Sequence, residues 1–205
     1  MVKAGYCFSW VTVLLLAGAS GASAEDSTKA EDWPWAASLG VLYVHPNVSS
    51  PVVHAEADDN VTPVANLSYF VTSNFALHAA AAITRHRLTA NGSDLGSVSI
   101  VPFNLLAQWH FLPGAKISPY VGVGLTHPLY YNQSGPVLDH VDQFHGQFGA
   151  IGELGVNFPV GRRTFVNLDW KHFWAKTDVI LKGGPKLETT TLDPDAVTIA
   201  YGIRF

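Results

Sequence analysis

The last ten residues of the chain, 196–205, alternate between two kinds of side chain. Large apolar residues hold every second position: Val197, Ile199, Tyr201, Ile203 and Phe205. Small or polar residues and one arginine lie between them: Thr198, Ala200, Gly202 and Arg204. A period of two predicts a β-strand whose two faces meet different surroundings. Two structures fit this strand: a soluble sheet, or a transmembrane β-barrel with its apolar face in lipid. The rest of the sequence distinguishes between them.

The first 24 residues have the pattern of an export signal. Lys3 precedes a short apolar core, and small residues at 22–24 form an A-x-A cleavage site. The core is far shorter than the roughly 20 residues that a spanning helix needs, so we expect cleavage after Ala24. Cys7 is the single cysteine of the sequence. Because it lies inside the signal, we expect a mature chain with no disulfide and no thiolate metal ligand.

The composition combines much apolar surface with few charges. Hydrophobic residues make up 48% of the chain and charged residues 14%, yet no apolar run of membrane-helix length follows Ala24. Lipid exposure of alternate strand residues would account for this surface without helical periodicity. The formal net charge of -4 provides no basic stripe, which argues against a nucleic-acid partner.

Eight segments show period-two patterning and are expected to be strands: about 35–44, 62–71, 75–85, 98–111, 118–126, 144–158, 164–176 and 196–205. Short turns at 72–74, 112–116 and 159–163 alternate with long polar connections at 46–61, 87–97, 127–143 and 177–194. This alternation is typical of a barrel with a trimmed periplasmic rim and a long-looped outer rim. We predict an all-β, eight-stranded antiparallel up-and-down transmembrane β-barrel over 35–205, preceded by a periplasmic segment over 25–34.

Aromatic residues near the strand ends support this prediction, as in the interfacial girdles of membrane barrels: Trp33, Trp35, Tyr43, Tyr69, Tyr130, Tyr131, Trp174 and Tyr201. Aromatic residues in such places are also common in ordinary cores. Two residues fit the barrel poorly. Pro102 interrupts the fourth predicted strand and removes a ladder donor, and His172 is expected to face lipid.

With the strands placed, ordered stretches of the chain resemble the OmpW family of small outer-membrane barrels, which includes the alkane-uptake protein AlkL. The matching stretches span most of the chain after Trp35: 67–75 (LSYFVTSNF), 105–111 (LLAQWHF), 119–124 (PYVGVG), 149–156 (GAIGELGV), 176–179 (KTDV), 192–194 (LDP) and 201–205 (YGIRF). The resemblance implies a bacterial outer-membrane protein that passively admits small hydrophobic molecules and releases them sideways through the wall.

The residues expected to face the lumen are partly apolar: Leu42, Phe70, Ile100, Leu106 and Ile151. An eight-stranded barrel is narrow, with an interior filled by side chains or able to hold one small ligand. These residues would suit a hydrophobic path and are poor choices for a water-filled channel. The alternative is that they close a solid core.

Charged residues are also expected to face inward: Glu153, Asp169, Lys171 and Arg204. Buried charges persist only when they are paired, so we interpret them as a structural ion-pair network in the periplasmic half. A proton or cation pathway is the less favoured interpretation. The network would favour a path in which a guest molecule leaves the lumen sideways, through the wall above the network.

The resemblance also implies partners. Outer-membrane lipids and lipopolysaccharide would surround the wall, and a small hydrophobic ligand would occupy the lumen. The terminal residues Tyr201, Ile203 and Phe205 resemble the insertion signal read by the outer-membrane assembly machinery. No cofactor is expected.

Three alternatives stay open. A lipid-modifying barrel enzyme needs an activated serine, but no His-x-Ser pattern occurs, and we expect no enzyme. A metal site over Asp139, His140, Asp142 and His145 matches no usual tetrahedral spacing, and none is expected. A surface-interaction protein could use the long loops to bind a phage, toxin or host surface.

Overall fold

The computed structural model describes residues 33–205, so the predicted signal segment and its cleavage after Ala24 lie outside the described residues. The chain forms strands β1 (Trp35–His45), β2 (Val48–Ser49), β3 (Ala55–Ala57), β4 (Asn60–Phe70), β5 (Phe75–Ala82), β6 (Thr84–Ala90), β7 (Ser93–His110), β8 (Ser118–Ser134), β9 (Val141–Gly146), β10 (Gly149–Pro159), β11 (Thr164–Leu181), β12 (Lys186–Leu192) and β13 (Asp195–Arg204). A 3-10 turn, η2 (Leu138–His140), precedes β9. No helix within residues 33–205 is long and apolar enough to cross a membrane.

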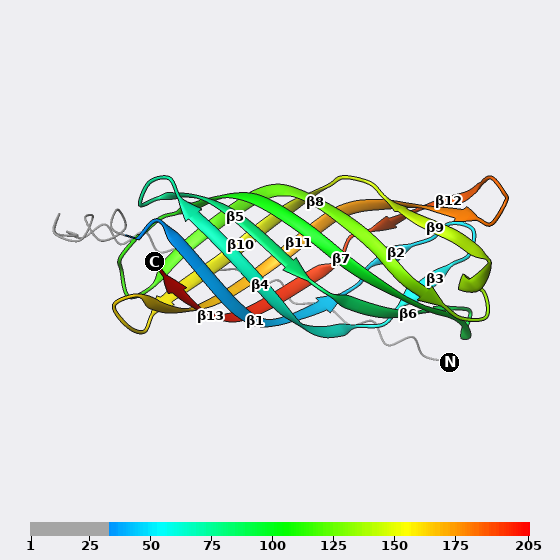
Figure 1. The fold of residues 1–205 in the computed structure, drawn as a ribbon, viewed down its shortest axis with the longest axis horizontal. Helices are drawn as coiled ribbons and strands as arrows, with labels where there is room; N and C mark the ends of the chain where they lie inside the picture. Colours follow the sequence, from blue (N-terminus) through cyan, green and yellow to red (C-terminus); the bar gives the residue numbers. More distant parts are fainter. Residues whose placement is uncertain (1–32) are drawn as a thin grey trace, which may run out of the picture.

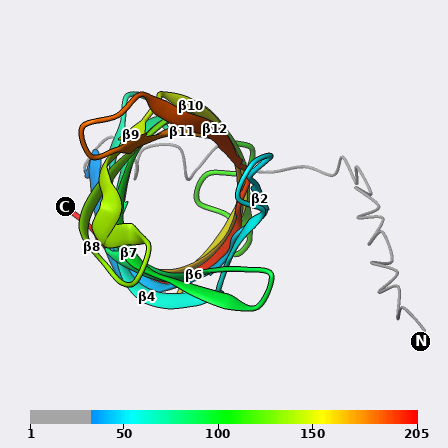
Figure 2. The same ribbon diagram turned by 90° about the vertical axis from the view of Figure 1, so that its right-hand side faces the viewer.

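The strands close into an eight-stranded antiparallel barrel. The hydrogen-bonded order runs β1, β4, β5, β7, β8, β10, β11 and β13, and β13 pairs with β1 again. Figure 2 shows this ring from one end, and Figure 1 shows the strands tilted along its length. Three further strands extend the ring toward the loop end: β6 pairs with β7 beyond β5, while β9 and β12 pair with β11 beyond β10 and β13. The predicted fold class is confirmed.

The strand register gives the stagger of the barrel. Phe70 of β4 pairs with Ala76, and the paired positions continue through β7, β8, β10, β11 and β13 to Val44 and Asn60. The circuit returns to β4 at Asn60, ten residues from its start at Phe70. A stagger of this size tilts the strands and leaves an interior of about side-chain width.

The two ends of the barrel differ. The turn end carries the three short connections at 71–74, 111–117 and 160–163, together with the carboxyl terminus. There the Trp35 and Phe205 backbones exchange two hydrogen bonds of 3.0 and 2.8 Å, which ties the last residue to the first strand. The opposite loop end carries β2, β3, β6, β9 and β12 (Figure 1).

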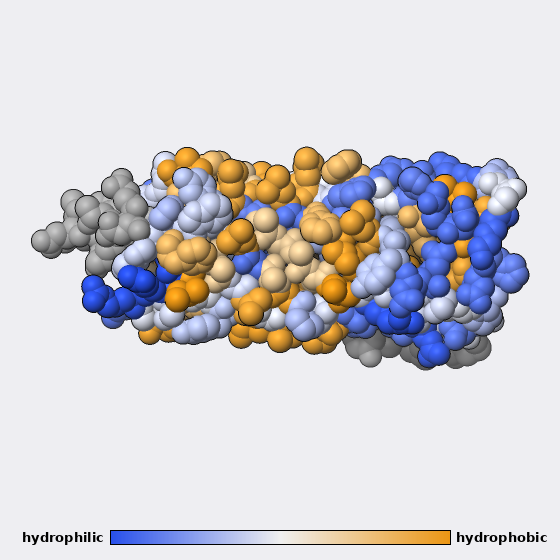
Figure 3. Space-filling view, in the orientation of Figure 1, coloured by the Kyte–Doolittle hydropathy of each residue, from blue (hydrophilic) through white to orange (hydrophobic). Residues whose placement is uncertain are grey.

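The outer face matches the predicted alternation. Val197, Ile199, Tyr201, Ile203 and Phe205 all point outward and are exposed. Figure 3 shows apolar side chains over the middle of the barrel, whereas hydrophilic residues lie at the rim of the turn end and cover the loop end. A hydrophobic band beside a polar cap is the exterior expected of a barrel that crosses a membrane.

The two residues that fitted poorly differ in their surroundings. His172 does face outward, where its Nδ1 lies 2.9 Å from Asp195 Oδ1, and Trp170 Nε1 donates to the same oxygen at 3.1 Å. Pro102 lies within β7 directly opposite Pro128 of β8. Tyr130 corrects the aromatic prediction: it faces inward, and its hydroxyl accepts a hydrogen bond from Thr177 at 2.6 Å.

The expected long loops are largely strands, which corrects the sequence prediction. β8 continues to Ser134 and β11 to Leu181, while the predicted strand at 144–158 is split into β9 and β10. A small apolar core lies inside this loop end: Val98, Leu138, Val141 and Val179. The outer surface here is hydrophilic (Figure 3), so these strands carry polar residues and turn formers that resemble loops in sequence.

A charge placed in the hydrophobic band should destabilise the barrel. Val123 faces outward in β8 and is 68% exposed. Val123→Arg should lower the free energy of unfolding by about 2–4 kcal/mol, because the guanidinium enters hydrocarbon. Denaturant unfolding of the protein in lipid vesicles measures this change. Val52→Arg is the control at the loop end, where Val52 is 59% exposed, and equal effects of the two changes would contradict the membrane position.

Candidate lumen site

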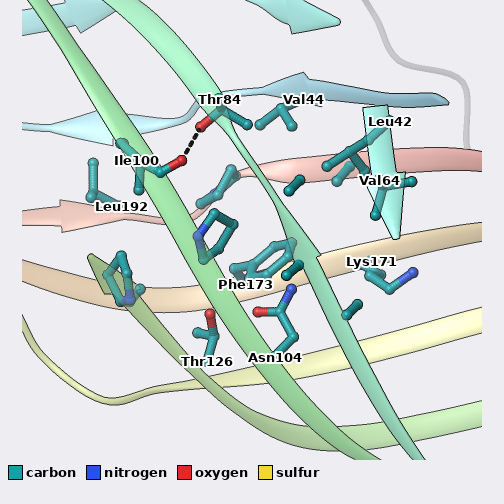
Figure 4. A pocket seen from close by; sticks show the side chains of 18 of the residues that line it. Leu42, Val44, Val64, Thr84, Ile100, Asn104, Thr126, Lys171, Phe173 and Leu192 are labelled. Carbon is teal, nitrogen blue, oxygen red and sulfur yellow. Dashed lines mark hydrogen bonds between the residues drawn. The ribbon is translucent and has the colours of Figure 1, made fainter. Parts of the chain in front are cut away.

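A mostly apolar cavity occupies the middle of the lumen. This middle cavity has a volume of about 90 Å³, and its walls come from strands on all sides of the ring. Its apolar lining includes Leu42, Val44, Val64, Ile100 and Phe173 (Figure 4). Small alanines on β5 leave the space unfilled, since Ala80 and Ala82 also face it.

A second cavity lies at the loop end. This loop-end cavity has a volume of about 160 Å³ and is enclosed largely by the apolar core of the loop end. It shares six lining residues with the middle cavity: Val44, His86, Ile100, Tyr130, Leu192 and Pro194. The two cavities are therefore adjacent along the lumen.

The segment 46–57 folds across the loop end. Its strands β2 and β3 pair with β12 and β6 respectively. The buried carboxylate of Glu188 on β12 accepts hydrogen bonds from Ser50 Oγ at 2.6 Å and from the Val52 amide at 2.9 Å. These bonds fasten the segment beside the mouth of the loop-end cavity.

A layer of buried charges crosses the lumen on the other side of the middle cavity. Lys171 Nζ lies 2.9 Å from Glu153 Oε1 and also donates to Asp169. Gln108 Nε2 donates to Glu153 Oε2 at 2.7 Å. All four side chains are buried. We call Glu153, Asp169 and Lys171 the ion layer; its mutual pairing is what permits charges in so narrow an interior.

Gly122 makes room for the ion layer. It is the cross-strand neighbour of Glu153, and a Cβ at this position would lie 2.7 Å from Glu153 Oε2. A larger residue would have to displace this oxygen, which accepts the hydrogen bond from Gln108. A glycine is therefore required here by close approach and not by backbone conformation.

Aromatic rings fill the turn end below the ion layer. Phe70 packs against His110 with ring centroids 5.0 Å apart, and His110 stacks on Tyr120 at 4.8 Å. The guanidinium of Arg204 lies over Phe70, 4.2 Å from the ring centroid. A space of about 30 Å³ lies among these side chains and their neighbours, smaller than either of the two cavities on the loop-end side of the ion layer.

The predicted lumen residues divide among these levels. Leu42, Leu106 and Ile151 belong to one buried cluster with Phe173, and Ile100 lies at the junction of the two cavities. Phe70 lies apart in the turn-end cluster. Of the predicted polar residues, Glu153, Asp169 and Lys171 form the ion layer, whereas Arg204 contacts Phe70.

Sequence reasoning missed several cavity residues. Phe173 continues the inward series of Asn167, Asp169 and Lys171, so the period alone could have identified it. His86 and Tyr130 lie in segments taken for loop or loop edge, which hid their inward positions. The loop composition gave no signal for them.

The wall beside the middle cavity has an interrupted backbone ladder. The β5–β7 pairing ends at Ala81 with Phe103, and the β6–β7 pairing begins at Thr84 with Ile100. Between them lies Pro102, which has no N–H to donate, opposite another proline, Pro128. We call this interval, residues 82–83 facing 101–102, the ladder gap.

Side chains replace backbone bonds on the other side of the gap. The β4–β5 pairing stops at Val64 with Ala82. Beyond it, Thr62 Oγ1 donates to the Ile83 carbonyl at 2.6 Å, and Asn60 Nδ2 donates to the Arg85 carbonyl at 2.9 Å. Two side-chain bonds therefore connect the strands here, in place of a continuous backbone ladder.

Metal chemistry has no support in the described part of the chain. Within residues 33–205, no group of three or more His, Cys, Asp or Glu side chains is placed to hold a metal ion. The acidic and histidine residues at 139–145 lie around η2 and β9.

Comparisons with known proteins agree on one family. The model of the OmpW family matches residues 34–205. The uncharacterized outer-membrane protein y4mB of Sinorhizobium fredii is 28% identical over 72% of this chain and 67% of its own length. The outer membrane protein AlkL of Ectopseudomonas oleovorans is 25% identical over 76% of this chain and 70% of its own. The dibenzothiophene metabolism operon protein PahQ of Pseudomonas aeruginosa is 25% identical over 87% and 92%.

Solved structures share the fold. The outer membrane protein OprG of Pseudomonas aeruginosa superposes with a TM-score of 0.68 at 17% identity, covering 83% of this chain and 95% of that one. The structure of AlkL in lipid bilayers superposes with a TM-score of 0.64 at 20% identity, covering 84% and 90%.

Removing the central cation of the ion layer should destabilise the barrel. Lys171→Met leaves two buried carboxylates facing each other, so we expect a loss of about 3–5 kcal/mol in the free energy of unfolding. Denaturant unfolding in lipid vesicles measures it. Adding Glu153→Gln and Asp169→Asn to Lys171→Met should recover most of the loss, because no unpaired charge remains. Lys186→Met, in the exposed part of β12, is the control, and an equal effect there would contradict the role of the ion layer.

Proposed function

The chain belongs to the OmpW family, and from that membership and the geometry of the lumen we propose that it is a passive uptake channel of the outer membrane for small hydrophobic molecules. The single observation that carries the proposal is the pair of adjacent apolar cavities, which begins at the loop end and stops at the ion layer. A membrane barrel with no ligand role would gain stability by filling this space with side chains.

In this proposal the loop end faces the cell exterior and the turn end faces the periplasm. A hydrophobic molecule enters the loop-end cavity, passes Ile100 and Tyr130, and reaches the middle cavity. Each step keeps the molecule against apolar side chains, so it never has to cross the hydrated sugars that surround the barrel.

The molecule leaves sideways in this proposal. Below the middle cavity, the ion layer and the turn-end rings offer no apolar path and almost no space. The ladder gap lies at the same level as the cavity, since Ala81, Ala82 and Pro102 line it. Exit through the gap delivers the molecule into the hydrocarbon of the membrane, where it is soluble.

The name of one relative supports a hydrophobic cargo. PahQ is described as a protein of a dibenzothiophene metabolism operon, and dibenzothiophene is an apolar aromatic compound. AlkL is an outer membrane protein, and its solved structure has the same fold. We propose lipids, lipopolysaccharide and the assembly machinery as the surrounding partners, the last through Tyr201, Ile203 and Phe205. We propose no enzymatic activity.

Filling the junction between the cavities should slow uptake. Ile100→Trp adds an indole where the two cavities meet, so accumulation of ¹⁴C-labelled toluene by cells carrying the variant should fall toward that of cells without the barrel. Leu129→Trp on the neighbouring strand is the control, because Leu129 points into lipid and is 45% exposed. Unchanged uptake by a well-folded Ile100→Trp protein would contradict the lumen path. Altered phage adsorption with normal uptake would favour a surface-interaction role.

A reversible staple across the ladder gap should test the sideways exit. The register is the same on both sides of the gap, which places Ile83 opposite Val101. The double change Ile83→Cys and Val101→Cys can form a disulfide at cross-strand distance. Uptake should fall in the oxidised protein and recover after reduction with dithiothreitol.

The intact ladder provides the matched control for the staple. Leu77 of β5 pairs with Ala107 of β7, the strand that also carries Val101. The backbone ladder is continuous at this pair. A disulfide between Leu77→Cys and Ala107→Cys should leave uptake unchanged. If the oxidised gap staple transports as well as its reduced form, the exit lies elsewhere.

A further inference from the structure

We propose that the preferred cargo carries one hydrogen-bond donor, such as the hydroxyl of a phenol or a small alcohol, and that Asn104 at the floor of the middle cavity receives it. This inference rests on the proposed function and narrows its substrate class. It separates neutral molecules with an apolar body and a donor group from bare hydrocarbons.

Asn104 is an unfilled acceptor in the lumen wall. It faces inward from β7 among the lining residues of the middle cavity. Its Oδ1 atom is buried, yet no group among residues 33–205 donates a hydrogen bond to it. Leaving a buried acceptor without a donor costs about 1–3 kcal/mol, so this atom marks a place where a donor is expected to bind.

The neighbours of Asn104 preserve this vacancy. Its cross-strand partners are Ala80 on β5 and Thr126 on β8. Ala80 has no donor and fills little space. Figure 4 shows the nitrogen of the Asn104 carboxamide toward the Phe173 ring and its oxygen on the side of Thr126. An aromatic or short alkyl body would lie against Phe173 while its donor group meets Asn104.

His86 provides a second acceptor closer to the loop end. Its Nδ1 lies 2.8 Å from the Asp58 carbonyl oxygen, and a carbonyl can only accept, so Nδ1 carries the proton. In the neutral ring the other nitrogen, Nε2, is then an acceptor. His86 lines both cavities. A donor group can therefore bond first to His86 and then to Asn104 as the molecule moves inward.

The charges near the cavities favour a neutral cargo. Lys171 also lines the middle cavity, but its ammonium is held by both Glu153 and Asp169. Glu188 lines the loop-end cavity and is bonded to Ser50 and Val52. A carboxylate ligand would find no free cation among the described residues that line the two cavities. An ammonium would lose its hydration among apolar walls.

Three probes of similar size test the inference: toluene, phenol and anisole. Toluene has no polar group, phenol can donate, and anisole can only accept. The protein is labelled at leucine and valine methyl groups in lipid nanodiscs, and shifts of the Leu42 and Val44 signals report occupancy of the cavity. Dissociation constants are expressed against the probe concentration in the lipid phase, which removes differences in partitioning.

Phenol should bind the unchanged protein roughly two- to tenfold more tightly than toluene or anisole, the range expected for one buried hydrogen bond. Asn104→Leu should abolish this preference while keeping the binding of toluene. Asn167→Leu is the matched control, because Asn167 is a buried lumen asparagine lining the turn-end space, which shares no lining residue with the middle cavity. It should keep the preference for phenol.

The outcomes separate this inference from the proposed function. Equal binding of the three probes to the unchanged protein would overturn the donor preference and leave the uptake proposal standing. A preference for phenol that persists in Asn104→Leu would overturn the role of Asn104. Absence of methyl shifts with all three probes would overturn the ligand cavity itself. The probe comparison on the unchanged protein still tests the donor preference if the Asn104 variant does not fold.

Discussion

Backbone hydrogen bonding in hydrocarbon is the constraint on which the rest of this structure depends. An unpaired amide or carbonyl in lipid costs several kcal/mol, so a sheet that crosses a membrane has to close on itself. Here β13 pairs with β1, and the Trp35 and Phe205 backbones complete the seam. Closure makes the ladder gap at Pro102 conspicuous, because the pairing with β7 stops there. On the opposite edge of the same segment, Thr62 and Asn60 bond to its carbonyl groups.

Closure also fixes what the lumen can contain. Eight staggered strands leave an interior of about side-chain width, so the size of each inward residue decides whether a level is open or filled. Alanines on β5 leave the middle cavity open, whereas Phe70, His110 and Tyr120 fill the turn end. The ion layer separates these two regions. Both cavities therefore lie on the loop-end side of the ion layer.

Much of the fold follows from the sequence because membrane barrels have a strict two-residue period. The outward face of 197–205 and the inward positions of Leu106, Glu153 and Lys171 were all predicted from that period. The extent of the strands was not. Beyond the membrane the outer face meets water, so residues such as those of β12 carry polar and turn-forming side chains and cannot be told from loops by composition.

The sequence by itself determined which face of each strand is apolar, because lipid imposes that choice one residue at a time. It also determined that charges would meet inside. Only the tertiary structure decided which inward residues share a level, because strand tilt and stagger displace neighbouring strands by amounts that no single segment encodes. That displacement brings Glu153 and Asp169 to Lys171 but places Arg204 on Phe70. It likewise leaves Asn104 beside Ala80, where an acceptor meets no donor among residues 33–205.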